Sequence, residues 1–208
     1  MSGPQGLVHP AADSWTSAEK ASEWRVVVGT SGTYALGASV LPRVLTLEAK
    51  EFNSYLEEDG LPDVLADRRA RGELGKPARE RYSKHVKTLI QVGDHRSERL
   101  DMVFGYAAEL VPLTNPYRLR AGGVLQVRAL VDGRPAVNQV VLSGGLDASG
   151  RRMTERSVRT NQNGVAPVTL RRPGVWYVKF IRMRRVDPSA GDSVDYESKW
   201  ATLTFAVR

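Results

Sequence analysis

The chain of 208 residues contains no cysteine and three histidines. Without cysteine, disulfide bonds, thiolate metal sites and cysteine nucleophiles are excluded. No run approaches the ~20 apolar residues that a membrane-spanning helix needs, and residues 1–15 lack the basic and apolar regions of a signal peptide. Hydrophobic residues still make up 41% of the chain, which is typical of a globular protein with its own core.

Positive charge is in excess, because 30 lysines and arginines stand against 23 acidic residues and leave a net charge of +7. Such an excess favours an acidic protein, an anionic membrane surface or a nucleic acid as partner. No helix-turn-helix or oligonucleotide-binding pattern is present, so we expect a protein partner and no nucleic acid. The densest basic run lies at residues 179–185, where charged and apolar residues alternate as on a strand with one solvated face.

From residue 86 onward, apolar and polar residues alternate with the period of a β-strand. The clearest runs cover residues 124–131, 176–183 and 200–207. Asp132-Gly133 and Asn163-Gly164 each separate two such runs, as in a hairpin. Many short strands without intervening helices predict a mainly β fold, an antiparallel Greek-key β-sandwich of the immunoglobulin or transthyretin type over residues 86–208.

Residues 48–85 have the pattern of a short helical linker. Apolar residues in its first part recur at helical spacing, namely Phe52, Tyr55 and Leu56. Thr46 is placed to cap this helix, and Pro62 is placed to begin a second one. A third, shorter helix is predicted over residues 77–85.

Residues 1–47 contain two strand-like runs, at 24–28 and 33–39. The segment 31–44 also parallels 173–186, because each has a glycine, an aromatic residue two positions later and then alternating apolar positions. This internal repeat predicts two related β modules. Since a sandwich needs about seven strands, residues 1–47 are interpreted as the remnant of a first module.

Several segments resemble, in order and spacing, domain-of-unknown-function family 4198, which is similar to the periplasmic component of nickel/cobalt uptake systems. The resemblance covers about residues 30–208 and includes FNSYLEEDGL (52–61), KPARERYSKHVKTLIQVG (76–93) and RTNQNGVAPVTLRRPGVWYVKFIRM (159–183). It implies a periplasmic, extracytoplasmic location and a link to nickel or cobalt. The last segment also resembles transthyretin-like and carboxypeptidase-regulatory modules.

Members of this family carry a signal peptide and a first sandwich that opens on a His-Asp-aromatic motif. Neither has a counterpart in this sequence, and His9 does not lie in such a motif. Either the sequence starts late, or the protein is trimmed, or this is a shortened relative; in each case the N-terminal histidine of the family has no counterpart here.

His85 and His95 are the candidate metal ligands, since a transition metal prefers clustered histidine and carboxylate groups. Asp94, Glu98 and Asp101 lie near them in the sequence, and an ordinary polar loop is the alternative interpretation. The acidic run at 57–59 suggests ligands for calcium or, in the absence of calcium-loop spacing, a solvated helix end.

The candidate partner-binding residues are Arg182, Arg184, Arg185, Tyr196 and Trp200. Tryptophan, tyrosine and arginine dominate the binding energy of protein interfaces. In the alternative, structural interpretation, the tryptophans belong to the core of the sandwich and the neighbouring acidic side chain pairs with a cation.

No catalytic motif is present in the sequence: there is no nucleophile elbow, no phosphate-binding loop and no dinucleotide fingerprint. We expect a non-enzymatic, extracytoplasmic binding or accessory protein, which the resemblance links to transition-metal uptake with nickel or cobalt as the implied ligand. The alternative is a structural or interaction subunit docked on the periplasmic face of a membrane protein complex, with no transmembrane segment of its own.

Overall fold

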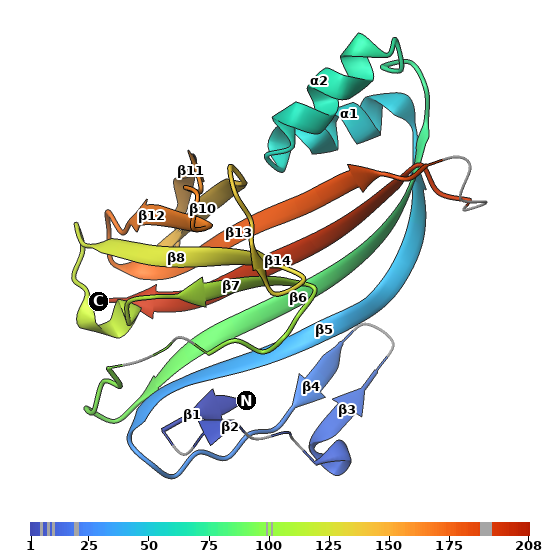
Figure 1. The fold of residues 1–208 in the computed structure, drawn as a ribbon. Coiled ribbons are helices and arrows are strands. Elements are labelled where there is room, and N and C mark those ends of the chain that lie inside the picture. Colours follow the sequence, from blue (N-terminus) through green and yellow to red (C-terminus); the bar gives the residue numbers. More distant parts are fainter. Residues whose placement is uncertain are drawn as a thin grey trace.

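Figure 1 shows a computed structural model of the protein, which describes residues 1–4, 6–7, 9, 11–18, 21–98, 100, 102–187 and 193–208. The described chain is mainly β, with two sheets packed against each other and two short helices at one end. The predicted fold class is therefore confirmed.

The larger sheet brings strands that are distant in the sequence side by side. From edge to edge its strands are β11 (Arg152–Arg159), β10 (Val140–Asp147), β13 (Gly174–Arg185), β14 (Tyr196–Val207), β6 (Ala78–Val92), β5 (Gly32–Leu47), β1 (Ser2–Gly3) and β2 (Gly6–Leu7). The sequence predicts a wholly antiparallel sheet, but β14 and β6 run parallel, with Tyr196 opposite Glu80 and Thr204 opposite Thr88. A parallel pair needs a long connection, and here that connection contains the whole smaller sheet.

The smaller sheet packs on one half of the larger one. It consists of β12 (Val165–Thr169), β8 (Val124–Val131) and β7 (Ala108–Pro112), with β9 (Arg134–Pro135) paired to β8. Every second side chain of these strands points into a shared core. The core includes Trp176, Val178, Phe180, Leu203 and Phe205 from the larger sheet and Leu110, Leu125 and Val127 from the smaller one.

One ion pair is buried inside this core. Lys87 of β6 contacts the carboxylate of Glu109 of β7, and the two side chains are 3% and 1% exposed. Glu109 also accepts hydrogen bonds from the main-chain N–H groups of residues 104–106, and Lys87 donates to the carbonyl of Met102 at 2.8 Å. Burial lowers the pKa of Lys87, and the nearby Glu109 carboxylate opposes this shift. The pair ties the segment before β7 to the larger sheet.

The two predicted hairpin turns have different outcomes. Asp132-Gly133 is a two-residue turn between β8 and β9, and both residues have a positive φ, of 49° and 74°, as a type I′ turn requires. The hairpin predicted at Asn163-Gly164 is wrong, because this turn joins β11 to β12, which belong to different sheets. The side chain of Asn161 stabilises the crossing by accepting the main-chain N–H of Asn163 at 2.9 Å.

Helices α1 (Ala49–Glu58) and α2 (Pro62–Ala70) form within the predicted linker, and Pro62 begins the second of them as expected. The residue that caps α1 is Glu48 and not Thr46, because Thr46 is still part of strand β5 and pairs with Arg79 of β6. The carboxylate of Glu51 accepts the main-chain N–H of Glu48 at 3.3 Å.

The third helix predicted over residues 77–85 is wrong, because Ala78 begins the long strand β6. Ala78 and Glu80 are buried while the residues beside them are more exposed, which is the period of a strand. The dense charges of this segment conceal that period. Residue 86, where the sandwich was expected to begin, lies inside the same strand.

The two echoing segments belong to strands of one sheet, β5 and β13, with β14 and β6 between them. The strand expected at 33–39 is confirmed as part of β5. The strand expected at 24–28 is not formed there, because the observed strand β4 (Ser22–Trp24) ends where that run begins. β4 pairs with β3 (Trp15–Ser17) in a separate two-stranded sheet. The short helix η1 (Ala12–Ser14) directly precedes β3.

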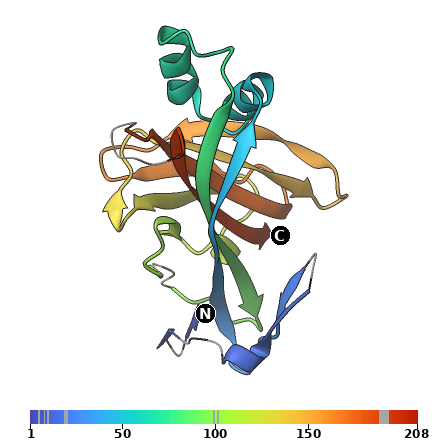
Figure 2. The same cartoon turned by 90° about the vertical axis from the view of Figure 1, so that its right-hand side faces the viewer.

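The helices pack on the face of the larger sheet opposite to the smaller sheet. Phe52 and Leu56 of α1 contact Ile181 and Met183, which alternate along β13 with the sandwich residue Phe180. We call the part of the larger sheet beneath the helices the helix end, and the part beneath the smaller sheet the sandwich end (Figure 1). Figure 2 shows the helices at one end of the long strands, and on the other face of this end the described residues Arg182 and Arg184 are exposed.

Candidate partner-binding surface

Cationic side chains from three neighbouring strands meet on the face of the helix end that is turned away from the helices. We call this surface the basic face; its cations are Arg79 and Arg81 of β6, Arg182 and Arg184 of β13, and Lys199 of β14. The period of two places them there, because they alternate with side chains that the helices cover. Strand register adds to the clustering, since Lys199 lies opposite Arg182 and Glu197 lies opposite Arg184.

The cations of the basic face differ in how they are paired. Arg184 contacts the carboxylate of Glu197, yet 66% of its side chain stays exposed. Lys199 donates to both carboxylate oxygens of Asp132, at 2.8 and 2.7 Å, and so connects the basic face to the β8–β9 turn. Arg182 is exposed and has no side-chain hydrogen bond or ion pair within the described part of the chain. The surface therefore keeps guanidinium groups that a partner could reach.

The structure divides the predicted partner-binding residues between the two faces of the sheet. Arg182 and Arg184 lie on the basic face, and for them the partner contact stays a prediction. Arg185, Tyr196 and Trp200 lie beneath the helices, where Tyr196 is only 1% exposed. These three side chains pack the helices onto the sheet, which agrees with the structural interpretation, although Trp200 belongs to the helix-end core and not to the sandwich.

Aromatic rings form the centre of the helix-end core. The ring of Tyr196 lies 5.1 Å from that of Phe52, and Trp200 is stacked on Tyr55 with ring centroids 5.7 Å apart. Arg185 adds a polar edge, because its guanidinium donates to the hydroxyl of Tyr196 at 3.0 Å and contacts the carboxylate of Glu73. These contacts explain why α1 and α2 dock at this position.

Arg68 of α2 is a charged residue buried in the helix-end core, with 2% of its surface exposed. Its guanidinium donates to Asn53 Oδ1 at 3.1 Å and to the carbonyls of Glu73 at 2.8 Å and Lys76 at 2.6 Å. It also lies over the ring of Phe52, 4.9 Å from the centroid. The side chain thus joins α1, α2 and the segment that leads into β6.

Glu80 of β6 is buried in the same core and is 1% exposed. Its carboxylate accepts hydrogen bonds from the hydroxyls of Tyr55, at 3.1 Å, and Ser198. Burial raises the pKa of Glu80, and the two hydroxyl donors partly offset that shift. Burial and the adjacent Glu80 carboxylate also raise the pKa of Tyr55 well above its usual range. The sequence reasoning missed Glu80 and Arg68, because both lie in charged runs that look solvated.

The two candidate metal ligands are not brought together. His85 lies near the middle of β6, where Nδ1 is 2.8 Å from Ser39 Oγ and the ring stacks on Tyr106. Burial and the nearby Lys199 lower the pKa of His85, and its Nε2 is buried without a hydrogen-bond partner. His95 lies beyond the end of β6, where its carbonyl accepts a hydrogen bond from the side chain of Gln91. Gln91 is six strand residues from His85, so the two histidines are roughly 20 Å apart at 3.3 Å per residue. Among the described residues, no three potential metal-ligating side chains form a group.

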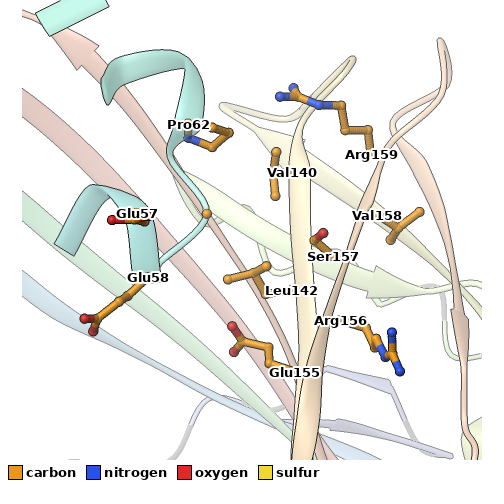
Figure 3. A pocket seen from close by; sticks show the side chains of 11 residues that line it. Glu57, Glu58, Pro62, Val140, Leu142, Glu155, Arg156, Ser157, Val158 and Arg159 are labelled. Atoms are coloured by element: carbon orange, nitrogen blue, oxygen red, sulfur yellow. The ribbon is translucent and has the colours of Figure 1, made fainter. Parts of the chain in front are cut away.

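The acidic run at 57–59 lies beside a cleft of about 520 Å³ between the α1–α2 turn and strands β10 and β11. Figure 3 shows Glu57 and Glu58 on the helix side of this cleft and Glu155 on the strand side. Asp59 does not join them in a ligand set, because its carboxylate pairs with Lys179 at 2.7 Å. The run therefore divides into two solvated side chains and one ion pair that fixes the helices to the sheet.

These features define a two-sheet β protein with a two-helix cover and a basic sheet face. The family described as "Domain of unknown function (DUF4198)" matches residues 7–184, and the chain belongs to this family. No curated protein and no solved structure matches the chain. Neither described helix is long and apolar enough to cross a membrane.

Proposed function

We propose that this chain is a non-enzymatic, extracytoplasmic accessory protein that docks onto an acidic protein partner through the basic face. The observation that carries the proposal is the pair Arg182 and Arg184, whose side chains lie exposed on the sheet face turned away from the helices. Arginine is suited to such contacts, because its planar fork binds a carboxylate through two parallel hydrogen bonds.

The backbone beneath the basic face supports a docking role. Arg182 and Arg184 sit on β13, whose ladder to β14 continues through both positions, whereas its ladder to β10 ends at Lys179. Side chains on a hydrogen-bonded strand are held in a more regular array than side chains on loops, so less ordering entropy is lost on binding. Complementary charge would then set the rate and specificity of association.

Two versions of this proposal differ in the partner. In the leading version the accessory role is linked to transition-metal uptake; the chain's membership of the family supports it only through the resemblance to nickel/cobalt uptake systems noted from the sequence. In the alternative version the chain is a structural or interaction subunit on the periplasmic face of another membrane complex. The basic face supports docking in both versions.

Retention on membranes measures the docking. The wild-type chain is expected to co-sediment with membranes of its host at low salt and to be released as salt rises, because the Debye length falls to about 3 Å at 1 M. The variant Arg182→Gln/Arg184→Gln is expected to lose most of this retention. Arg128→Gln/Arg134→Gln, which removes two exposed arginines from the smaller sheet, is the matched control. Equal retention of both variants would contradict a role for the basic face.

Nickel or cobalt titration distinguishes the two versions. A chain that carries the metal itself gains thermal stability with rising metal concentration by mass action, and His85→Ala is the variant that should reduce this gain. If neither metal changes the melting temperature, the chain does not carry the metal itself. The docking role is then tested by the membrane experiment alone.

A further inference from the structure

A second basic site lies at the opposite end of the larger sheet. Two adjoining cavities of about 520 and 730 Å³ share four lining residues, and together they form one continuous groove. We call this groove the arginine cleft. Its cationic side chains are Arg96, Arg118, Arg120 and Arg208.

Three separate chain segments supply these arginines. Arg96 follows β6, Arg118 ends the short helix η2 (Pro116–Arg118) with Arg120 just beyond it, and Arg208 follows β14. Arg208 follows Lys199 of the basic face by nine positions along β14 and its end, which is roughly 30 Å at 3.3 Å per residue. The cleft is therefore a separate site, and its occupancy does not depend on docking at the basic face.

A buried polar network holds the walls of the cleft. Asn115, which is 1% exposed, donates to Thr33 Oγ1 and to the carbonyl of Ser97, both at 2.8 Å. Thr33 is fully buried, and its main-chain N–H donates to Ser97 Oγ at 3.1 Å. These bonds fix the loop after β6 against the start of η2. A satisfied buried network of this kind makes the surrounding backbone rigid.

Tyr117 connects this network to the first arginine. Its main-chain N–H donates to Asn115 Oδ1 at 3.0 Å, and its hydroxyl donates to the carbonyl of Leu89 at 2.7 Å. Its carbonyl accepts the Nε–H of Arg96 at 2.7 Å, and the carbonyl of Asp94 accepts from Nη1 at 3.2 Å. Arg96 is thereby oriented while Nη2 remains without a partner among the described residues.

The other guanidinium groups are hardly neutralised. The side chains of Arg120 and Arg208 have no hydrogen bond or ion pair within the described ranges. Arg118 lies 3.6 Å from the carboxylate of Glu98, but the two side chains are 49% and 84% exposed, and such an exposed pair contributes little. Four arginines stand against one lining acidic residue, Asp94, so the groove keeps an excess of positive charge that a bound anion would offset.

We infer that the arginine cleft binds the phosphate groups of a small polyanionic ligand. Guanidinium forks from several directions suit the tetrahedral oxyanion of a phosphate, which accepts paired hydrogen bonds on each edge. The volume of each cavity is in the range of small-molecule sites. The same chemistry is found in a free phosphorylated compound and in the headgroup of an anionic lipid.

Calorimetric titration of the full chain with inorganic pyrophosphate at constant ionic strength tests this inference. The cleft variant is Arg120→Gln/Arg208→Gln, which removes two exposed, unpaired side chains and is expected to keep the wild-type melting temperature. It should bind pyrophosphate about tenfold or more weakly, because charge-assisted hydrogen bonds are lost. The control variant Arg128→Gln/Arg134→Gln has the same change in charge on the smaller sheet and should bind like the wild type.

Equal weakening in the cleft and control variants would show a general charge effect and would overturn the inference. Absence of pyrophosphate binding to the wild type, or citrate binding as tight as pyrophosphate, would also overturn it. Flotation with phosphatidylcholine vesicles, with and without phosphatidylglycerol, separates the two sources of phosphate. Cleft-dependent retention on the anionic vesicles assigns a lipid headgroup, and pyrophosphate binding without such retention assigns a free ligand.

Discussion

The two ends of the larger sheet are stabilised in different ways. The sandwich end is closed by a second sheet, and its core is almost entirely aliphatic and aromatic, with the Lys87–Glu109 pair as its buried charges. The helix end is closed by two short helices, and its core mixes aromatic rings with the buried side chains of Arg68 and Glu80. One sheet therefore continues from a hydrophobic core into an interface that depends on polar contacts.

This difference shows how the two helices acquire a specific position on the sheet. Two sheets bury a large apolar area, and the burial is stabilising without precise geometry. Two helices of 10 and 9 residues bury much less, and short helices are marginal on their own. The hydrogen bonds of Arg68 and the ion pairs of Asp59 and Arg185 orient them. The following three predictions test this contrast.

The largest effect is expected from the variant Lys87→Met at the sandwich end. It leaves the carboxylate of Glu109 buried without its cation, and breaking one partner of a buried pair costs about 3–5 kcal/mol. Urea unfolding followed by tryptophan fluorescence measures the loss. The double variant Lys87→Met/Glu109→Gln removes both charges and should recover most of it; a double variant as unstable as the single one would disprove the electrostatic explanation.

A smaller and local effect is expected from Arg68→Met at the helix end. The change leaves Asn53 Oδ1 and two carbonyls without their donor, at a cost of about 1–3 kcal/mol. Hydrogen exchange should show lost protection in residues 49–76 and unchanged protection in β8. The neighbouring exposed residue provides the control, because Arg69→Met should change stability by less than about 0.5 kcal/mol. Equal loss of protection in β8 would mean that the two ends unfold together.

The smallest effect is expected from Glu80→Gln. The raised pKa of Glu80 means that its favourable contribution is present below its ordinary pKa of 4.5 and is lost as the pH rises through the folded-state value. The amide stays neutral, so the variant should be more stable than the wild type at pH 8, by about 1 kcal/mol, and the difference should vanish toward pH 4. Thermal unfolding across this range measures it. A wild type that is the more stable at pH 8 would show that the carboxylate is stabilising.

The strands of the smaller sheet and the end of the larger one could be predicted because their alternation is local. Strand β8 coincides with the predicted run, and β13 and β14 contain theirs. The first half of β6 could not, because its buried positions include Glu80, whose place in a core depends on Tyr55 and Ser198 from distant parts of the chain. The hairpin predicted at Asn163-Gly164 was wrong for a similar reason: contacts distant in the sequence decide which sheet the next strand joins, and the turn sequence does not specify this.

The sites show a similar division. The exposed positions of Arg182 and Arg184 follow from strand alternation, so two of the five cations of the basic face could be predicted. Arg79 and Arg81 could not, because the segment that carries them was expected to be helical. The arginine cleft was also beyond the sequence, since its side chains come from three segments that approach one another only when β6 and β14 have paired.

The parallel pairing of β6 and β14 also determines when the protein can fold. The hydroxyls of Thr88 and Thr204 lie 2.7 Å apart although 116 residues separate them in the sequence. Contacts between such distant residues make folding slow, because the chain must close a large loop before the contact stabilises it. Until β14 pairs with β6, the antiparallel pair of β5 and β6 exposes an unpaired strand edge to which other chains can bind. The pairing of β6 with β14 is therefore also the folding step at which aggregation competes with folding.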